Sequence, residues 1–124
     1  MIVVGVDPGA RYTGIVVVNA STRVLIGHST VQRDASRPQL PLDGEYLFNV
    51  IRTFRAMSAA YPRALVGVEV ITDPTRHMGR AAYNVEPLLA TALLAGVIVG
   101  LSADGSEVQL APAGFGGAAL GQYP

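Results

Sequence analysis

The feature that most constrains the fold is the stretch from Ile2 to Gly14, which reads IVVGVDPGARYTG. A run of β-forming residues leads into Asp7, a tight link follows, and a second β-rich run begins after it. The four residues DPGA fit a type II turn, in which Pro8 presets φ at the second position and Gly9 takes the positive φ of the third. Asp7 thus lies at the end of a strand. Because burying an unpaired carboxylate is costly, we expect its side chain to face water or a cation.

Length and composition predict a single folded domain. The chain has 124 residues, of which 50% are hydrophobic and 15% charged, so it can build a core and is not disordered over most of its length. The absence of cysteine excludes disulfides and thiolate metal sites and fits a reducing, cytoplasmic location. No basic and apolar leader is recognised. The most apolar run, 88–101, is shorter than the roughly 20 residues of a membrane helix, so we expect a buried helix and no membrane partner.

The charge balance does not by itself indicate a partner. The formal net charge is zero, and all nine basic residues are arginine, which is the better bidentate ligand for phosphate. An arginine-only composition also arises in GC-rich genomes. The charge count therefore neither identifies nor excludes a nucleic-acid-binding protein.

The hydrophobic pattern predicts five strands and two helices. The strands are expected at 1–6, 13–19, 24–31, 64–70 and 107–111, and the helices between the N-cap Asp43 and Pro62 and, capped by Asn84, at 85–102. Leu42 and Leu47 are placed for a hydrophobic staple around the first cap. The first three strands pair antiparallel, and each later strand–helix–strand step requires parallel pairing. The predicted fold class is α/β: a mixed five-stranded sheet with helices packed on it, formed by residues 1–112, followed by a flexible glycine-rich tail at 113–124.

Two acidic residues are expected at one edge of this sheet. Asp7 closes the first strand and Glu69 lies near the end of the fourth, and parallel neighbours would bring both to the carboxyl edge, where open α/β sheets bind ligands. Gly5 and Gly67 stand two residues before the acids, so each glycine shares a face with its acid and leaves room beside it. Such a pair repels unless a cation lies between, and Mg²⁺ suits hard oxygen ligands. The alternative is that each acid only ends its strand, at a turn or beside an arginine.

These residues resemble a known family. The segment GVDPGARYTG, from Gly5 to Gly14, looks like the opening of the RuvC Holliday-junction resolvases, and Val68-Glu69 is similar to their second acidic motif. The order of strands and helices matches the RNase H-like fold of that family. The lysine-free composition resembles the shorter relatives that phages of GC-rich bacteria carry. The resemblance implies a homodimeric endonuclease that nicks four-way junctions with two Mg²⁺ ions, for which Mn²⁺ can substitute, with Asp7 and Glu69 as catalytic and metal-binding residues.

The chain departs from the family at one point. The resolvases carry further acids, or a histidine, on a C-terminal helix after the last strand, and none follows here. Two carboxylates are few ligands for two ions. We therefore interpret the chain as a C-terminally incomplete nuclease, whose tail leads to a missing helix, and expect weak metal binding and poor activity from residues 1–124 alone.

Four basic residues are expected to rim the same edge. Arg11 leaves the turn beside Asp7, while Arg76, His77 and Arg80 lie in the loop after Glu69, where they could hold DNA phosphates. The alternative is a solvated loop. The apolar helix at 85–102 is richer in small residues than one sheet contact needs, which also fits a dimer interface.

Two other functions remain open from the sequence. A nucleotide-binding domain of the actin and sugar-kinase type also begins with a strand, an aspartate and a glycine, but it needs a second domain and further phosphate loops. A non-catalytic module of the same fold, which binds branched DNA without cutting it, would account for the missing acids. Binding without cleavage separates this module from the nuclease, and a thermal shift with ATP would support the nucleotide-binding domain.

Overall fold

The structure is a computed structural model that describes residues 1–71, 85–102 and 107–112. Its elements, in chain order, are β1 (Ile2–Asp7), β2 (Tyr12–Asn19), β3 (Val24–Gln32), α1 (Gly44–Ser58), β4 (Leu65–Val70), α3 (Glu86–Ser102) and β5 (Val108–Pro112). Every strand and helix that the sequence predicts is present.

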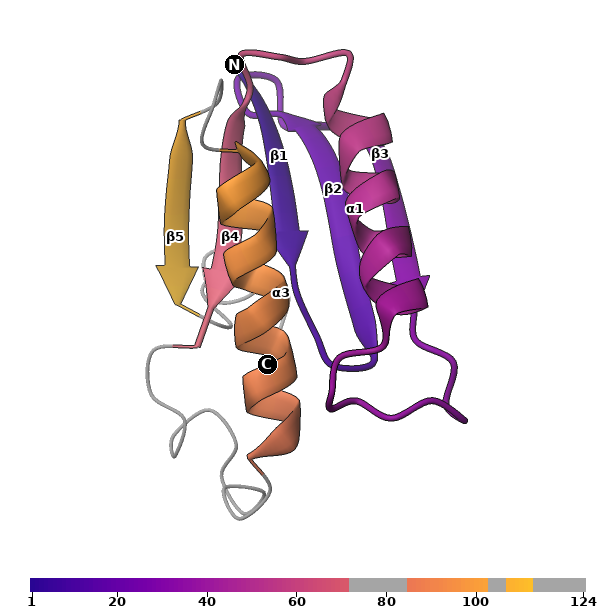
Figure 1. Ribbon diagram of the computed structural model, residues 1–124. Helices are drawn as coiled ribbons and strands as arrows, with labels where there is room; N and C mark the ends of the chain where they lie inside the picture. The colour runs from indigo at the N-terminus through magenta and orange to yellow at the C-terminus, as the bar shows by residue number, and fades with distance from the viewer. Residues whose placement is uncertain (72–84, 103–106, 113–124) are drawn as a thin grey trace, which may run out of the picture.

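The five strands form one mixed sheet in the order β3-β2-β1-β4-β5. β1 pairs antiparallel with β2, and β2 with β3, whereas β4 runs parallel to both β1 and β5. Both helices cover the same face of this sheet, α1 over β2 and β3 and α3 over β4 (Figure 1). The predicted fold class is therefore confirmed: an α/β fold with a mixed five-stranded sheet and helices packed on it.

The core lies between the helices and that face. Along β1, Val4 and Val6 are buried while Gly5 and Asp7 point to the other face, as the two-residue period of a strand requires. The buried apolar side chains come from four strands and both helices: Val4, Val6, Ile15, Val17, Val31, Val66, Val68, Tyr46, Val50, Phe54, Leu94, Ala95 and Ile98. Within the described residues, no helix packs on the opposite face, which carries the acids.

Helix α1 begins as predicted and ends earlier. The Asp43 side chain caps it by accepting a hydrogen bond from the Tyr46 amide at 3.3 Å, and the staple residues Leu42 and Leu47 pack against the core. The helix stops at Ser58, although the apolar spacing predicted that it would continue to Pro62. Pro62 disfavours helical φ and ψ at Tyr61, the residue before it, so the helix cannot extend as far as the proline.

Helix α3 is only half buried, which corrects the prediction of a buried helix. Its inner face packs through residues such as Leu94 and Ile98, which have no exposed surface, whereas Leu89 and Leu93 on the outer face are each 52% exposed. No described helix combines the length and the apolar character needed to cross a membrane. An uncharged outer face thus runs along most of α3.

Candidate functional site

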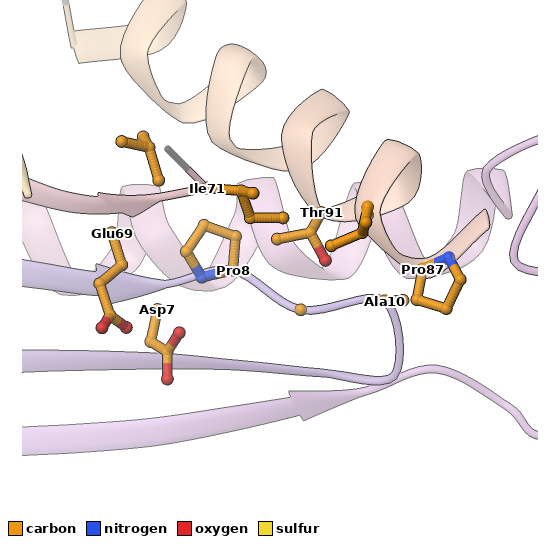
Figure 2. A pocket seen from close by; sticks show the side chains of 10 residues that line it. Asp7, Pro8, Ala10, Glu69, Ile71, Pro87 and Thr91 are labelled. Carbon is orange, nitrogen blue, oxygen red and sulfur yellow. The ribbon is translucent and has the colours of Figure 1, made fainter. Parts of the chain in front are cut away.

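Asp7 and Glu69 lie side by side at the carboxyl ends of β1 and β4. The parallel register pairs Val6 with Val68, so the two acids occupy the next position on each strand. Figure 2 shows both side chains on the same side of the strands, and their carboxylates are close enough to share a hydrogen bond. The predicted adjacency is therefore confirmed. It follows from the α1 crossover, which returns the chain to the strand position beside β1.

The electrostatics of this pair favour a bound cation. Three causes together raise the pKa of Asp7 from 3.8 to about 7: partial burial, which is the largest, the hydrogen bond with the Glu69 side chain, and the negative charge of that side chain. Without a counter-ion, the pair therefore retains a proton near neutral pH. A divalent cation would offset the repulsion between the two carboxylates, and carboxylate oxygens are the ligands that Mg²⁺ prefers. The two carboxylates could thus supply part of the oxygen ligand set of a Mg²⁺ ion.

Three glycines, which carry no side chains, surround the two acids on the open face of the sheet. Gly5 and Gly67 precede them by two residues, and Gly14 of β2 is the direct antiparallel partner of Asp7. Among described atoms, a Cβ built at Gly14 or Gly67 meets nothing within 4 Å, and one at Gly5 meets only Val16 Cγ2, at 3.1 Å. The described chain therefore leaves the face beside the carboxylates open, as the sequence pattern of Gly5 and Gly67 predicts.

A cavity of about 190 Å³ lies at this edge of the sheet. Its walls come from the two acids, the ends of β1 and β4 and the first turns of α3: Asp7, Pro8, Gly9, Ala10, Glu69, Val70, Ile71, Pro87, Leu88 and Thr91 (Figure 2). This volume holds several water molecules. The carboxylates are therefore reachable by water and by small ions.

The link between β1 and β2 is not the type II turn that the sequence predicts. The φ angle of Gly9 lies outside the left-handed region, so the positive φ expected there is absent. Glycine is needed for a different reason, because a Cβ at this position would overlap the carbonyl oxygen of Tyr12. The link takes its shape from groups outside it, and it has no hydrogen bond of its own that closes a turn.

These external groups hold three consecutive carbonyls of the link. The Tyr46 hydroxyl of α1 donates to the Gly9 carbonyl at 2.6 Å. Arg33 Nε donates to the Ala10 carbonyl at 2.9 Å, and the Arg33 amide donates to the Arg11 carbonyl at 2.8 Å. Sequence reasoning missed these roles. The one available signal was the position of Tyr46, which precedes Val50 and Phe54 by one and two helical turns on the buried face of α1.

The predicted basic rim is only partly described. Arg11 lies in the link after Asp7, is exposed, and places its guanidinium carbon 5.3 Å from the centre of the Tyr12 ring. Arg76, His77 and Arg80 lie outside the described residues, as do Asn84 and the tail at 113–124. Their assignment to DNA phosphates stays a prediction.

Residues 1–71, 85–102 and 107–112 contain no group of three or more histidine, aspartate or glutamate side chains that could hold a metal ion. Glu86 starts α3 at this edge, and its carboxylate accepts a hydrogen bond from Gln39 Nε2 at 3.2 Å. The described part of the site therefore supplies one pair of carboxylates, from Asp7 and Glu69.

Comparison with known proteins gives the fold. No protein-family model matches the sequence, and no curated protein matches it. Solved structures do match, and two of them are Thermus thermophilus RuvC in complex with a Holliday junction substrate and Thermus thermophilus RuvC. Each has a TM-score of 0.58 and 20% sequence identity, over 91% and 90% of this chain respectively. The chain spans 65% and 64% of their lengths. It therefore has a RuvC-like fold, consistent with the RNase H-like arrangement that the predicted order of its strands and helices matches.

Proposed function

We propose that this chain is the catalytic core of a metal-dependent, structure-selective DNA endonuclease that resolves four-way junctions. The observation that carries the proposal is the Asp7–Glu69 pair on an open face of the sheet, with the pKa of Asp7 raised to about 7. The fold adds support, because one of the similar structures is a RuvC bound to a Holliday junction substrate. The Asp7–Glu69 pair supports the proposed metal-dependent cleavage, and the similarity in fold supports the proposed class of substrate.

The two acids would act as ligands of Mg²⁺, or of Mn²⁺ in its place. Bound metal would polarise the phosphodiester and make water a better nucleophile at neutral pH. The contribution of the protein is to hold Asp7 and Glu69 adjacent and on one face, where a bound cation would favour the ionised form of both. The glycines around them leave the space that a DNA backbone needs for close approach.

The test compares nicking of a four-way junction with nicking of a linear duplex of the same sequence, in Mg²⁺ and in Mn²⁺. Since two carboxylates are an incomplete ligand set, we expect weak metal binding and slow nicking by residues 1–124, with preference for the junction. Asp7→Asn and Glu69→Gln should abolish the nicking. Cleavage that survives either substitution, or that is equal on the two substrates, would reject the proposal.

A second candidate is a module that binds branched DNA without cutting it. The observation that favours it is that the described residues bring only two acids together. A native gel with labelled junction in Ca²⁺ measures binding without cleavage. Tight junction binding combined with no nicking at any metal concentration would favour this candidate over the nuclease.

The basic residues would hold the DNA backbone in either case. Arg11 and, outside the described residues, Arg76, His77 and Arg80 are the proposed phosphate ligands. Each lost phosphate contact lowers the salt dependence of binding by about one unit of log–log slope. Reversing the charge of Arg76 and Arg80 together should therefore weaken junction binding and flatten its salt dependence, and an unchanged slope would remove these two residues from the proposal.

A further inference from the structure

A closed ring of hydrogen bonds holds the link that follows Asp7. Thr13 Oγ1 and Tyr46 Oη lie 2.8 Å apart, and Tyr46 Oη lies 2.6 Å from the Gly9 carbonyl oxygen. The Gly9 amide completes the ring by donating to Thr13 Oγ1 at 3.4 Å. Three residues from β2, α1 and the link thus share one circuit of contacts.

The chemistry of these groups fixes the direction of every bond. The Gly9 carbonyl can only accept, so the single proton of the Tyr46 hydroxyl points to it. Tyr46 Oη must then accept from Thr13, whose hydroxyl donates. Thr13 Oγ1 in turn accepts from the Gly9 amide. Each hydroxyl therefore donates once and accepts once, and no orientation is left free.

The ring is shielded from water. Thr13 is fully buried and Tyr46 is 1% exposed, and no described buried side-chain polar atom lacks a partner. Burial also raises the pKa of Tyr46, which keeps the phenol protonated and able to donate. Hydrogen bonds in such a setting are strong and directional, because water cannot compete for the groups.

We propose that Thr13 and Tyr46 are positioning residues, which fix the link after Asp7 and thereby hold the Asp7 carboxylate beside Glu69. Only Pro8 separates Asp7 from Gly9, and its ring locks φ, so a constraint on Gly9 passes directly to Asp7. Arg33, which directly follows β3, holds the next two carbonyls of the link. The value of this positioning for metal binding rests on the proposed function. The constraint on Asp7 itself is present in the metal-free protein.

The variants remove one hydroxyl each and keep the shape. Tyr46→Phe removes the hydroxyl and leaves the aromatic side chain packed against the core. Thr13→Val replaces the hydroxyl with a methyl group and keeps the shape of the side chain. Thr13→Ser keeps the hydroxyl and should restore wild-type behaviour. Ser102→Ala is the matched control: Ser102 is also buried, and its hydroxyl donates to the Ile98 carbonyl at 2.7 Å in the last turns of α3, whereas the first turns of α3 line the cavity at the acids.

The first measurement is NMR on the metal-free protein. In the wild type we expect one χ1 rotamer for Asp7 and a protected Gly9 amide. Tyr46→Phe and Thr13→Val should average the Asp7 χ1 couplings and speed Gly9 exchange about tenfold beyond any change in the β1 and β4 core amides, since one buried hydrogen bond is worth about that factor. Ser102→Ala should change neither signal. Unchanged Asp7 couplings, or a Gly9 rate that only follows global stability as in Ser102→Ala, would overturn the proposal.

The second measurement is the affinity for Mn²⁺, followed by paramagnetic broadening. Tyr46→Phe and Thr13→Val should bind Mn²⁺ about tenfold more weakly, because a ligand that must be ordered on binding loses affinity. Thr13→Ser and Ser102→Ala should bind it as the wild type does. Equal affinities in all five proteins, with measurable binding, would contradict the positioning role. A wild type that binds no Mn²⁺ would instead contradict the proposed nuclease, and the Asp7 couplings would still decide whether the ring holds this side chain.

Discussion

At the scale of single residues, the candidate site consists of two adjacent acids and of the groups that hold the link after Asp7. Asp7 and Glu69 could be identified because each ends a β-rich run and follows a glycine by two positions. Gly9 was recognised as necessary, but for the wrong reason, because its contact with the Tyr12 carbonyl depends on how the link folds. The hydroxyls of Thr13 and Tyr46 could not be assigned, since their bonds form only after α1 lies over β2.

The raised pKa of Asp7 predicts how stability depends on pH. In the folded, metal-free protein the pKa is about 7, above the ordinary 3.8, so folding favours the protonated form. This contribution is fully present below about pH 4 and is lost as the pH rises through about 7. Asp7→Asn should therefore be more stable than the wild type at pH 8, by about 1 kcal/mol once solvent screening of this only partly buried carboxylate is allowed for.

Urea denaturation at pH 5 and pH 8 measures this difference. The wild type should lose stability between the two values relative to Asp7→Asn, and saturating Mg²⁺ at pH 8 should recover part of the loss in the wild type only. A stability difference that is the same at both pH values would contradict the raised pKa.

At the scale of elements, the sequence predicted which strands and helices form and how the strands pair. It predicted the ends of the helices less accurately. All five strands follow from their β-branched runs, and the cap at Asp43 places the start of α1. The end of α1 was missed because apolar spacing continues past Ser58 while the backbone does not. The exposed side of α3 was missed because a helix that is apolar all round gives no periodicity from which to separate a buried face from an exposed one.

The position of Gly14 in β2 makes a prediction about the open face of the sheet. Gly14→Val adds bulk beside Asp7 where nothing described lies within 4 Å, so folding should be unchanged or slightly improved by the better β-propensity of valine. Junction nicking should fall about a hundredfold, because the added side chain displaces the substrate backbone from the acids.

Thr30→Val is the matched control for Gly14→Val. Thr30 is the exposed partner of Gly14 on β3, one strand further from Asp7. The Thr30→Val variant carries the same valine, but it adds almost no bulk because threonine and valine are nearly equal in size. Thermal denaturation and junction nicking are measured on both variants. Wild-type nicking by Gly14→Val, or an equal loss in Thr30→Val, would show that this space is not used by the substrate.

At the scale of the whole molecule, the sheet has two different sides. One is packed by both helices, and the other carries the acids and remains open within the described residues (Figure 1). The uncharged outer face of α3 lies on the packed side. We propose that this face forms a homodimer. Leu89 and Leu93 are exposed one helical turn apart, and the exposed Gly96 and Gly100 follow them along α3.

Substitution of the outer face of α3 tests the dimer. Leu93→Glu places a charge in the proposed interface and should shift the protein from dimer to monomer in sedimentation velocity. Phe48→Glu is the control, since Phe48 is 67% exposed on α1, away from α3's outer face, and should leave the association unchanged. A wild type that sediments as a monomer, or equal effects of both variants, would contradict the dimer.

The parallel pairing of β1 with β4 has a consequence for folding. Because α1 must cross over before β4 can join β1, the two acids are far apart in an unfolded or half-folded chain and adjacent only in the finished sheet. A divalent ion that needs both therefore recognises the native state alone, and by mass action it raises stability in proportion to the logarithm of its concentration. Metal added during refolding would therefore report the step at which β4 pairs with β1, and it would leave the steps before that pairing unaffected.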